Sequence, residues 1–257
     1  VYHIVGDRNF KNGLRHYFKK HAYSNTTGDD LWRALSKASG IDVASIMHAW
    51  ITQSGFPYIK ITPLSETSVT VEQHQLSTMS ASEEKIWPIP LWQERQSQLA
   101  LLEAKTACVS VSTPSSRFNV FGGHYVPYYT DPQVRAHIYE QVATQNIAPD
   151  GRLLILHDAV LLARCGVSSL TDALEGLAFY ANETAESVWS VISIVIGDTR
   201  MIIEGDENAE AALRSFTLKL VSRQYQRLGL QDKPTDTGND RKLRSIIAGL
   251  AVYSENP

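Results

Sequence analysis

The segment Trp50–Ile61 reads WITQSGFPYIKI and marks a change from a helical to a strand-like sequence. Apolar residues before it follow a helical spacing, Gly55 allows the backbone to turn, and Pro57 prevents a helix from continuing. Apolar and polar residues then alternate up to Ile61, as they do in strands. About fifty residues precede the proline, which are too few for a self-sufficient helical domain. The sequence therefore raises the question of what these helices pack against.

Three helices are predicted before the proline. The second begins near Asp29 or Asp30, and the third begins after Asp42, because a carboxylate near a helix N-terminus is favourable. Each helix has an apolar stripe at i, i+3 or i+4 spacing. The stripe residues of the first and third helices are Phe10, Leu14, Tyr17 and Phe18, and Val43, Ile46, Met47, Trp50 and Ile51.

From residue 58 to about residue 129 the sequence predicts strands. Short runs of alternating and β-branched residues, such as Val69–Gln73, are separated by Ser, Pro and Gly. This pattern is typical of a small β-sandwich of roughly 70 residues. Two prolines within Trp87–Pro90 exclude a central strand there and favour a sheet edge, because proline cannot donate a ladder hydrogen bond.

Residues 131–257 return to helical spacing with short connections. One example is the set Leu243, Ile246, Ile247 and Leu250. Four glycines are expected near helix ends, namely Gly166, Gly197, Gly205 and Gly229. We expect stacked antiparallel helix pairs, as in an α-solenoid.

The composition is that of an ordinary globular protein, with 43% hydrophobic residues and a net charge of −3 among 257 residues. The slight negative charge disfavours nucleic acid as a partner. The longest apolar stretch, Val188–Ile196, is too short to span a membrane, and the first ten residues lack a signal-peptide pattern. The two cysteines, Cys108 and Cys165, predict reduced thiols. Together these features predict a cytoplasmic protein.

No reaction motif is present. The sequence contains no His-Glu-x-x-His, phosphate-binding loop, Gly-x-Ser-x-Gly or Cys-x-x-Cys. We expect the eight histidines to be surface or packing residues: His3, His16, His21, His48, His74, His124, His137 and His157. The sequence therefore predicts no catalytic, cofactor-binding or metal-binding residue in this chain.

Three other features invite a functional interpretation, and for each we favour a structural one. The aromatic, glycine-containing segment Phe121–Tyr129 is expected to fill a seam between domains rather than bind carbohydrate or bases. Arg152 and Asp158 are six positions apart, so they do not form an i, i+4 pair; a charge that contacts a neighbouring helix is expected. A basic helix face is expected to be solvated, and it consists of Arg15, Lys19 and Lys20.

Several segments, taken in order, resemble the aminopeptidase N family of zinc aminopeptidases, which includes puromycin-sensitive aminopeptidase and the tricorn-interacting factors. The strongest matches are NFKNGLRHYFKKHAYSNTTGDDLWRAL at residues 9–35 and DVASIMHAWITQSGFPYIKI at residues 42–61. Further matches are WPIPL at residues 87–91, NIAPDGRLLILHDAVLLARCG at residues 146–166 and YANETAESVW at residues 180–189. One departure is HYVPYYTD at residues 124–131, which lacks an arginine that the family often carries there.

The resemblance implies a multidomain fold. Residues 1–56 would be the last helices of a thermolysin-like catalytic domain, residues 57–130 a β-sandwich, and residues 131–257 part of a HEAT-like or ARM-like superhelical domain. The zinc motif, the amine-binding motif Gly-x-Met-x-Asn and the catalytic tyrosine would all lie before Val1. We therefore expect zinc and peptide substrates to belong to the parent enzyme, and the missing catalytic domain to pack on residues 1–56. Alone, the chain is expected to be inactive and able to dimerise through its N-terminal helices.

A second interpretation stays open at this point. The chain is then a standalone, non-enzymatic sandwich and helical-repeat scaffold that binds peptides or proteins. In that case the first helices should bury their apolar stripes within the chain.

Overall fold

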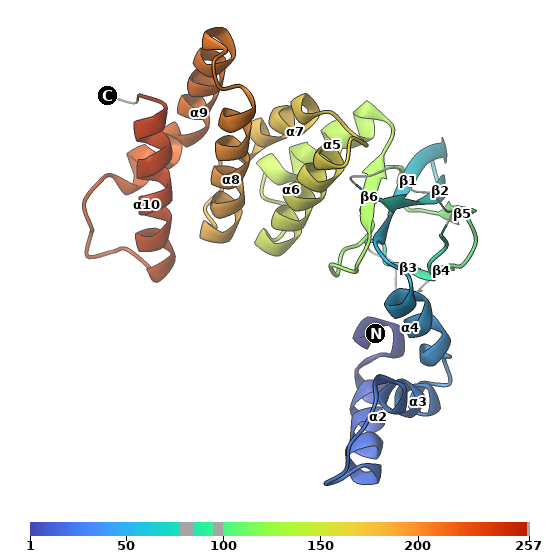
Figure 1. The fold of residues 1–257 in the computed structure, drawn as a ribbon. Helices are drawn as coiled ribbons and strands as arrows, with labels where there is room; N and C mark the ends of the chain where they lie inside the picture. Colours follow the sequence, from blue (N-terminus) through green and yellow to red (C-terminus); the bar gives the residue numbers. More distant parts are fainter. Residues whose placement is uncertain (78–84, 95–99, 256–257) are drawn as a thin grey trace. The chain divides into compact units, whose positions relative to one another are not determined.

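The computed structural model describes residues 1–77, 85–94 and 100–255, which form two compact units, Val1–Asp131 and Pro132–Pro257 (Figure 1). Among these residues, the first unit contains four helices and six strands, and the second contains helices and no strand. The chain thus combines helices with one small mixed sheet and a two-stranded sheet. The domain boundaries predicted from the sequence, 1–56, 57–130 and 131–257, remain predictions.

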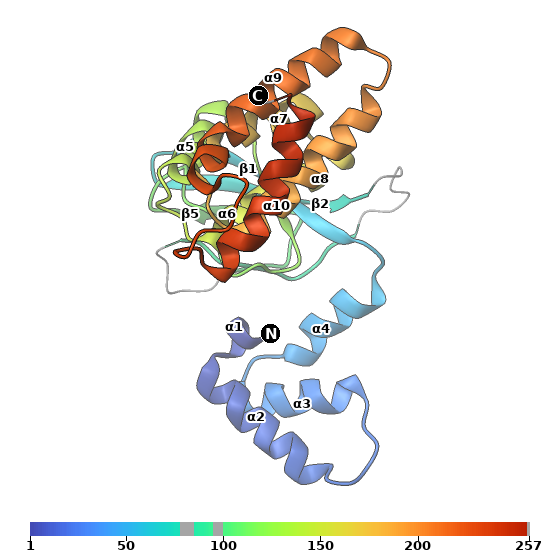
Figure 2. The ribbon, with the colours of Figure 1, turned by 90° about the vertical axis from the view of Figure 1, so that its left-hand side faces the viewer.

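The first unit begins with a short helix and three longer ones (Figure 2). Their bounds are α1 Tyr2–Val5, α2 Asp7–Lys20, α3 Gly28–Ser39 and α4 Val43–Thr52. At the start of α3, the Asp30 carboxylate accepts the Thr27 backbone N–H at 3.0 Å. At the start of α4, Asp42 accepts the Ser45 N–H at 3.0 Å. Side-chain oxygens thus satisfy backbone donors at both predicted starts.

The helix α4 ends at Thr52, slightly before the glycine that the sequence suggested as its stop. Gln53 is already in extended backbone, with φ −96° and ψ 130°. Gly55 has φ +86°, a conformation that favours glycine, and a β-carbon there would lie 2.8 Å from the Gln75 amide nitrogen. Gly55 therefore turns the chain into the first strand instead of capping the helix.

Six strands follow: β1 Phe56–Ser65, β2 Ser68–Leu76, β3 Ile89–Leu91, β4 Ala100–Leu102, β5 Thr106–Ser110 and β6 Val126–Tyr129. One sheet has the order β5-β2-β1-β6, and β3 pairs with β4 in a second. Alternate residues of β1 and β2 are buried, and they share one core with Trp87, Ile89 and Leu91. Two sheets over a common core fit the strand pattern of the sequence.

In the described residues, each proline of these strands is at a position that pairs with a neighbouring strand on one side only. Pro90 is in β3, whose only partner among the described residues is β4, as the two prolines of the Trp87–Pro90 segment predict. β1 lies between two strands, but its pairing with β6 covers only Tyr58 to Ile61, so Pro57 and Pro63 fall outside that pairing. The β1–β6 pair is parallel. Alternation within a strand does not predict the direction of its neighbours, and the parallel pair was not anticipated.

The described part of the second unit, residues 132–255, contains six α-helices and one 3-10 turn. Their bounds are α5 Pro132–Ala143, α6 Pro149–Arg164, α7 Leu170–Leu177, η1 Ala178–Tyr180, α8 Glu186–Ile202, α9 Glu207–Leu228 and α10 Gly238–Tyr253. α6 contacts α7 and α8, and α10 contacts α8 and α9. One core runs through the unit, with Trp189 and Ile192 of α8 fully buried in it.

The prediction that Gly197 lies near a helix end is wrong. It lies inside α8, which continues to Ile202. The buried stripe of α8 extends past the glycine, from Ile192 through Ile196 to Thr199. Burial of this face keeps the helix intact across a residue of low helix propensity. In the described part of the chain, no helix has the length and apolarity that a membrane span requires.

Candidate functional site

The N-terminal helices bury little of their apolar surface within the chain. Their core has three buried side chains, Val5, Leu35 and Val43, with partly buried neighbours. Other apolar side chains face solvent: Phe18 is 65% exposed and Ile51 is 60% exposed. Isolated exposed apolar residues are common, but bulky ones around so small a core mark a surface that can accept a partner. We refer to Tyr2, Phe18, Tyr23 and Ile51 as the exposed apolar set.

The same helices are tied to the β region through α4. The Trp50 indole N–H donates to the Pro88 carbonyl at 3.1 Å, and the Gln53 amide donates to the Ile86 carbonyl at 3.0 Å. Trp50 also packs against the core that lies between the two sheets. The basic residues Arg15 and Lys19 of α2 are exposed, as predicted.

The described residues do not fit a catalytic zinc. Within residues 1–77, 85–94 and 100–255, no group of three or more His, Cys, Asp or Glu side chains is placed to hold a metal ion. Zinc sites require three or four such ligands. The histidines that contact other side chains pack on aromatic rings or lie beside one Asp or Glu. His3 stacks on Phe121, with ring centroids 4.1 Å apart, and His74 stacks on Tyr58. No reaction step can be assigned to a metal in this part of the chain.

Phe121–Tyr129 is shaped by a buried asparagine. Asn119 is fully buried with φ +57°, and its side-chain amide donates to the carbonyls of Gly123 at 3.0 Å and Tyr125 at 2.6 Å. In return, its side-chain oxygen accepts the Gly123 N–H at 2.5 Å. This side chain replaces the backbone hydrogen bonds that the loop lacks. Phe121 meets His3, so the loop contacts the N-terminal helices.

Arg152 forms a buried ion pair with a residue 31 positions away. Its Nε and Nη2 donate to the Glu183 carboxylate at 2.6 and 2.7 Å, and its Nη1 donates to the Ile147 carbonyl at 2.6 Å. The backbone N–H groups of Thr184 and Ala185 donate to the same carboxylate at 2.7 and 2.8 Å. Arg152 does make a structural contact, but with the loop before α8 and not with the neighbouring helix that was predicted. The partner, Glu183, was not predicted, although it lies in the family-like segment 180–189.

The electrostatics of this pair are dominated by burial and hydrogen bonding. Burial alone raises the pKa of Glu183, but hydrogen bonds from Arg152, Ala185 and Thr184 outweigh it and bring the pKa below its usual value. The hydrogen bond with Glu183 raises the pKa of Arg152. Asp158 on the same helix is buried, and desolvation raises the pKa of its carboxyl well above the ordinary value. We assign these groups a structural role, and none of them lines the cavity described next.

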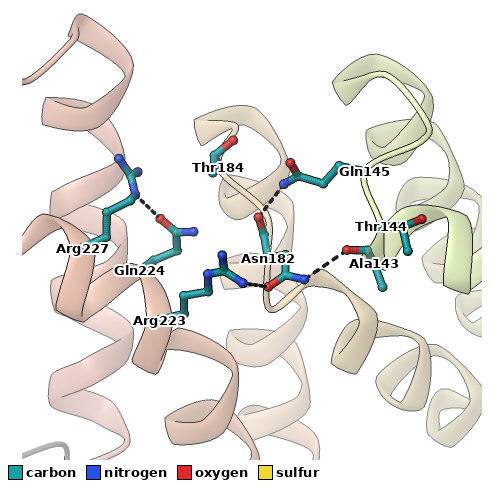
Figure 3. Close-up of a pocket in the computed structure, with 8 residues that line it drawn as sticks. All are labelled: Ala143, Thr144, Gln145, Asn182, Thr184, Arg223, Gln224 and Arg227. Atoms are coloured by element: carbon teal, nitrogen blue, oxygen red, sulfur yellow. Dashed lines mark hydrogen bonds between the residues drawn. The ribbon is translucent and has the colours of Figure 1, made fainter.

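A separate cavity of about 460 Å³ lies wholly within the helical unit (Figure 3). Its walls come from the end of α5, the loop before α8 and the last turns of α9. They consist of Ala143, Thr144, Gln145, Asn182, Thr184, Arg223, Gln224 and Arg227. None of these residues is acidic and two are arginines. No sequence pattern indicated the cavity, because its residues come from three segments that only packing brings together.

Comparison with known proteins identifies two families along the chain. Residues 122–257 match the ERAP1-like C-terminal domain, and residues 1–50 match the peptidase family M1 domain. "Aminopeptidase N" of Lactococcus lactis subsp. lactis (strain IL1403) is 30% identical over 98% of this chain, and "Aminopeptidase 2" of Candida albicans is 28% identical over 98%. The chain spans 30% and 28% of the length of these two relatives. The chain therefore belongs to the M1 aminopeptidase family and carries its ERAP1-like C-terminal domain at residues 122–257.

Proposed function

We propose that this chain is the non-catalytic portion of a zinc-dependent aminopeptidase that removes N-terminal amino acids from peptides. In this proposal, residues 1–56 are the last helices of a thermolysin-like catalytic domain, residues 57–130 are a β-sandwich spacer, and residues 131–257 are part of a HEAT-like or ARM-like helical domain that encloses peptides. Relatives named as aminopeptidases align over 98% of the chain and support this assignment.

One observation carries the proposal: a segment that matches a peptidase domain lacks a substantial core of its own. Residues 1–50 match the M1 domain, yet only a few side chains of α1–α4 are fully buried. Phe18 and Ile51 are exposed apolar residues on two of these helices. A peptidase domain that covered the exposed apolar set would remove this surface from water, and each large side chain would contribute about 1.5–3 kcal/mol. We therefore propose the catalytic body of an M1 peptidase as the partner of α1–α4.

Other features of the proposal follow from this partner. Peptide substrates and zinc belong to the complete enzyme, in which zinc would activate water and polarise the scissile carbonyl. In the absence of the peptidase body, two copies of the chain pair through α1–α4, because the same apolar side chains are free to associate. We place the protein in the cytoplasm, without nucleic acid as a partner. A standalone scaffold is the less favoured reading, because the first helices leave apolar side chains exposed.

The experiment compares the chain with an intact relative. The purified chain and Aminopeptidase N of Lactococcus lactis are assayed on leucine p-nitroanilide, and bound zinc is measured by mass spectrometry. We expect hydrolysis and about one zinc per molecule for the relative only, as a single-zinc site requires. Hydrolysis by the purified chain that a chelator abolishes would show that the chain is itself catalytic.

The self-association is tested by sedimentation of the chain and of its Phe18→Ser variant. We expect the wild type to dimerise and the variant to be monomeric, since the substitution removes an exposed ring. Lys20→Ser is the control on the same helix and should leave the dimer intact. A wild type that stays monomeric at high concentration would contradict the predicted pairing.

A further inference from the structure

The cavity in the helical unit has the chemistry of an anion-binding site. Arg223 is exposed at its wall, and no carboxylate in the described part of the chain forms an ion pair with it. Its Nη1 donates to the side-chain oxygen of Asn182, which is neutral and leaves the charge uncompensated (Figure 3). An arginine has five N–H donors in a planar fork that matches carboxylate or phosphate oxygens.

A second donor is held in place by a chain of contacts that starts outside the cavity. Arg227 is anchored to Asp240, with 2.6 Å between Nη1 and the carboxylate. Its Nε donates to the side-chain oxygen of Gln224 at 2.7 Å, which leaves the amide nitrogen of Gln224 on the cavity side (Figure 3). Gln224 is only 1% exposed, and its amide nitrogen has no hydrogen-bond partner among the described residues. This nitrogen is not among the buried side-chain atoms that lack a partner, so it stays accessible from the cavity and can donate to a bound acceptor.

The opposite wall is fixed as well. The Asn182 amide donates to the Ala143 carbonyl at 3.1 Å, and the Gln145 amide donates to the Asn182 carbonyl at 2.5 Å. Asn182 thus joins the end of α5 to α9 through Arg223. Since both walls are held by side-chain hydrogen bonds, the donors are positioned before a ligand arrives, which lowers the entropic cost of binding.

We propose that this cavity binds a small oxyanion, a carboxylate or a phosphate, between the Arg223 guanidinium and the Gln224 amide. The volume suits a compact ligand, and the absence of an acidic lining residue removes the repulsion that an anion would otherwise meet. The inference is independent of the proposed function, because all the residues involved lie within residues 132–257. No covalent chemistry is involved.

The test is calorimetric titration of the full chain with inorganic phosphate, with succinate and with uncharged succinamide, at constant ionic strength. We expect at least one anion to bind in a 1:1 ratio and succinamide not to bind. Arg223→Gln should weaken that binding by about tenfold or more, because a charge-assisted bidentate contact is lost. The relative strength of phosphate and succinate identifies which oxyanion the site accepts.

The matched control is Lys219→Gln, which removes the same charge one turn earlier on α9 at an exposed residue outside the cavity. It should change affinity by less than about twofold, since it alters only the screened long-range field. Arg223→Lys keeps the charge but loses the fork, and it should give an intermediate affinity if Arg223→Gln does not fold. The proposal would be overturned if neither anion bound, or if succinamide bound as well as the anions. It would also be overturned if Arg223→Gln and Lys219→Gln lost the same amount of anion affinity.

Discussion

The guanidinium of Arg152 lies 2.6 Å from the carboxylate of Glu183, and both side chains are almost completely buried, with 5% and 1% of their surface exposed. The pair joins α6 to the loop before α8 across 31 positions of sequence. The Tyr180 hydroxyl donates to the Arg152 carbonyl at 2.8 Å, and the Trp189 indole donates to the Glu183 carbonyl at 2.9 Å. Backbone and side-chain groups of both partners are thus connected in one network.

We expect Arg152→Met to destabilise the helical unit by about 3–5 kcal/mol, because the Glu183 carboxylate would stay buried without its partner. Hydrogen exchange of peptides from residues 132–255 measures the change. Arg164→Met is the control on the same helix, since Arg164 pairs with Asp198 at the surface, and it should cost less than about 1 kcal/mol. Equal effects of the two substitutions would show that burial of the pair is unimportant.

Glu183 also makes stability depend on pH. Its folded pKa lies below that of the unfolded chain, so the unfolded state binds more protons in acid. The stabilisation is complete above the unfolded pKa of about 4.3 and is lost as pH falls through the lowered folded pKa. Melting temperatures measured between neutral and acidic pH should show this loss, and a Glu183→Gln variant should show a shallower dependence.

Asp158 should make the stability of the fold depend on pH in the opposite direction. Burial raises its folded pKa, so the folded state holds a proton that the unfolded state releases above about pH 3.9. Stability is therefore lost as pH rises from that value towards the folded pKa. We expect Asp158→Asn to melt at a higher temperature than wild type at pH 7, with the difference vanishing near pH 4. Asp150→Asn, an exposed change on the same helix, should not raise the melting temperature.

Replacing a helical glycine with alanine should lower stability at Gly13 and raise it at Gly197. At Gly13, a β-carbon would lie 2.7 Å from Cδ2 and 3.2 Å from Cα of the fully buried Leu35, so Gly13→Ala should push α2 and α3 apart and destabilise the first unit. At Gly197, nothing lies within 4 Å, so Gly197→Ala should stabilise α8 by about 0.8–1 kcal/mol. Urea unfolding of each variant provides the measurement. A destabilising Gly197→Ala would contradict the open space beside α8.

The contact between α4 and the β region should depend on one indole. Trp50→Phe removes the hydrogen bond to the Pro88 carbonyl and should cost about 1–2 kcal/mol. Faster hydrogen exchange in residues 43–52 would report the loss. Ile51→Ala at the next position serves as the control, because that side chain is largely exposed and should leave the exchange rates unchanged.

Sequence patterns predicted the elements whose signals are local. The helical spacing located α2, α3 and α4, and Asp42 caps α4 as expected. The two prolines of the Trp87–Pro90 segment placed β3 at a sheet edge. These features depend on residues a few positions apart, so their physical causes are visible in the sequence. Gly197 was misplaced because its effect depends on the packing of α8, which local propensity does not contain.

The sequence by itself determined the order of helices, strands and helices, together with the resemblance to M1 aminopeptidases. Only the tertiary structure decided which distant groups meet: Glu183 with Arg152, β6 in parallel with β1, and Asn182 with Arg223. Spacing along the chain fixes which face of an element is apolar, because the backbone has a regular period. Spacing does not determine which polar groups from distant elements form contacts, since those contacts depend on how whole elements pack.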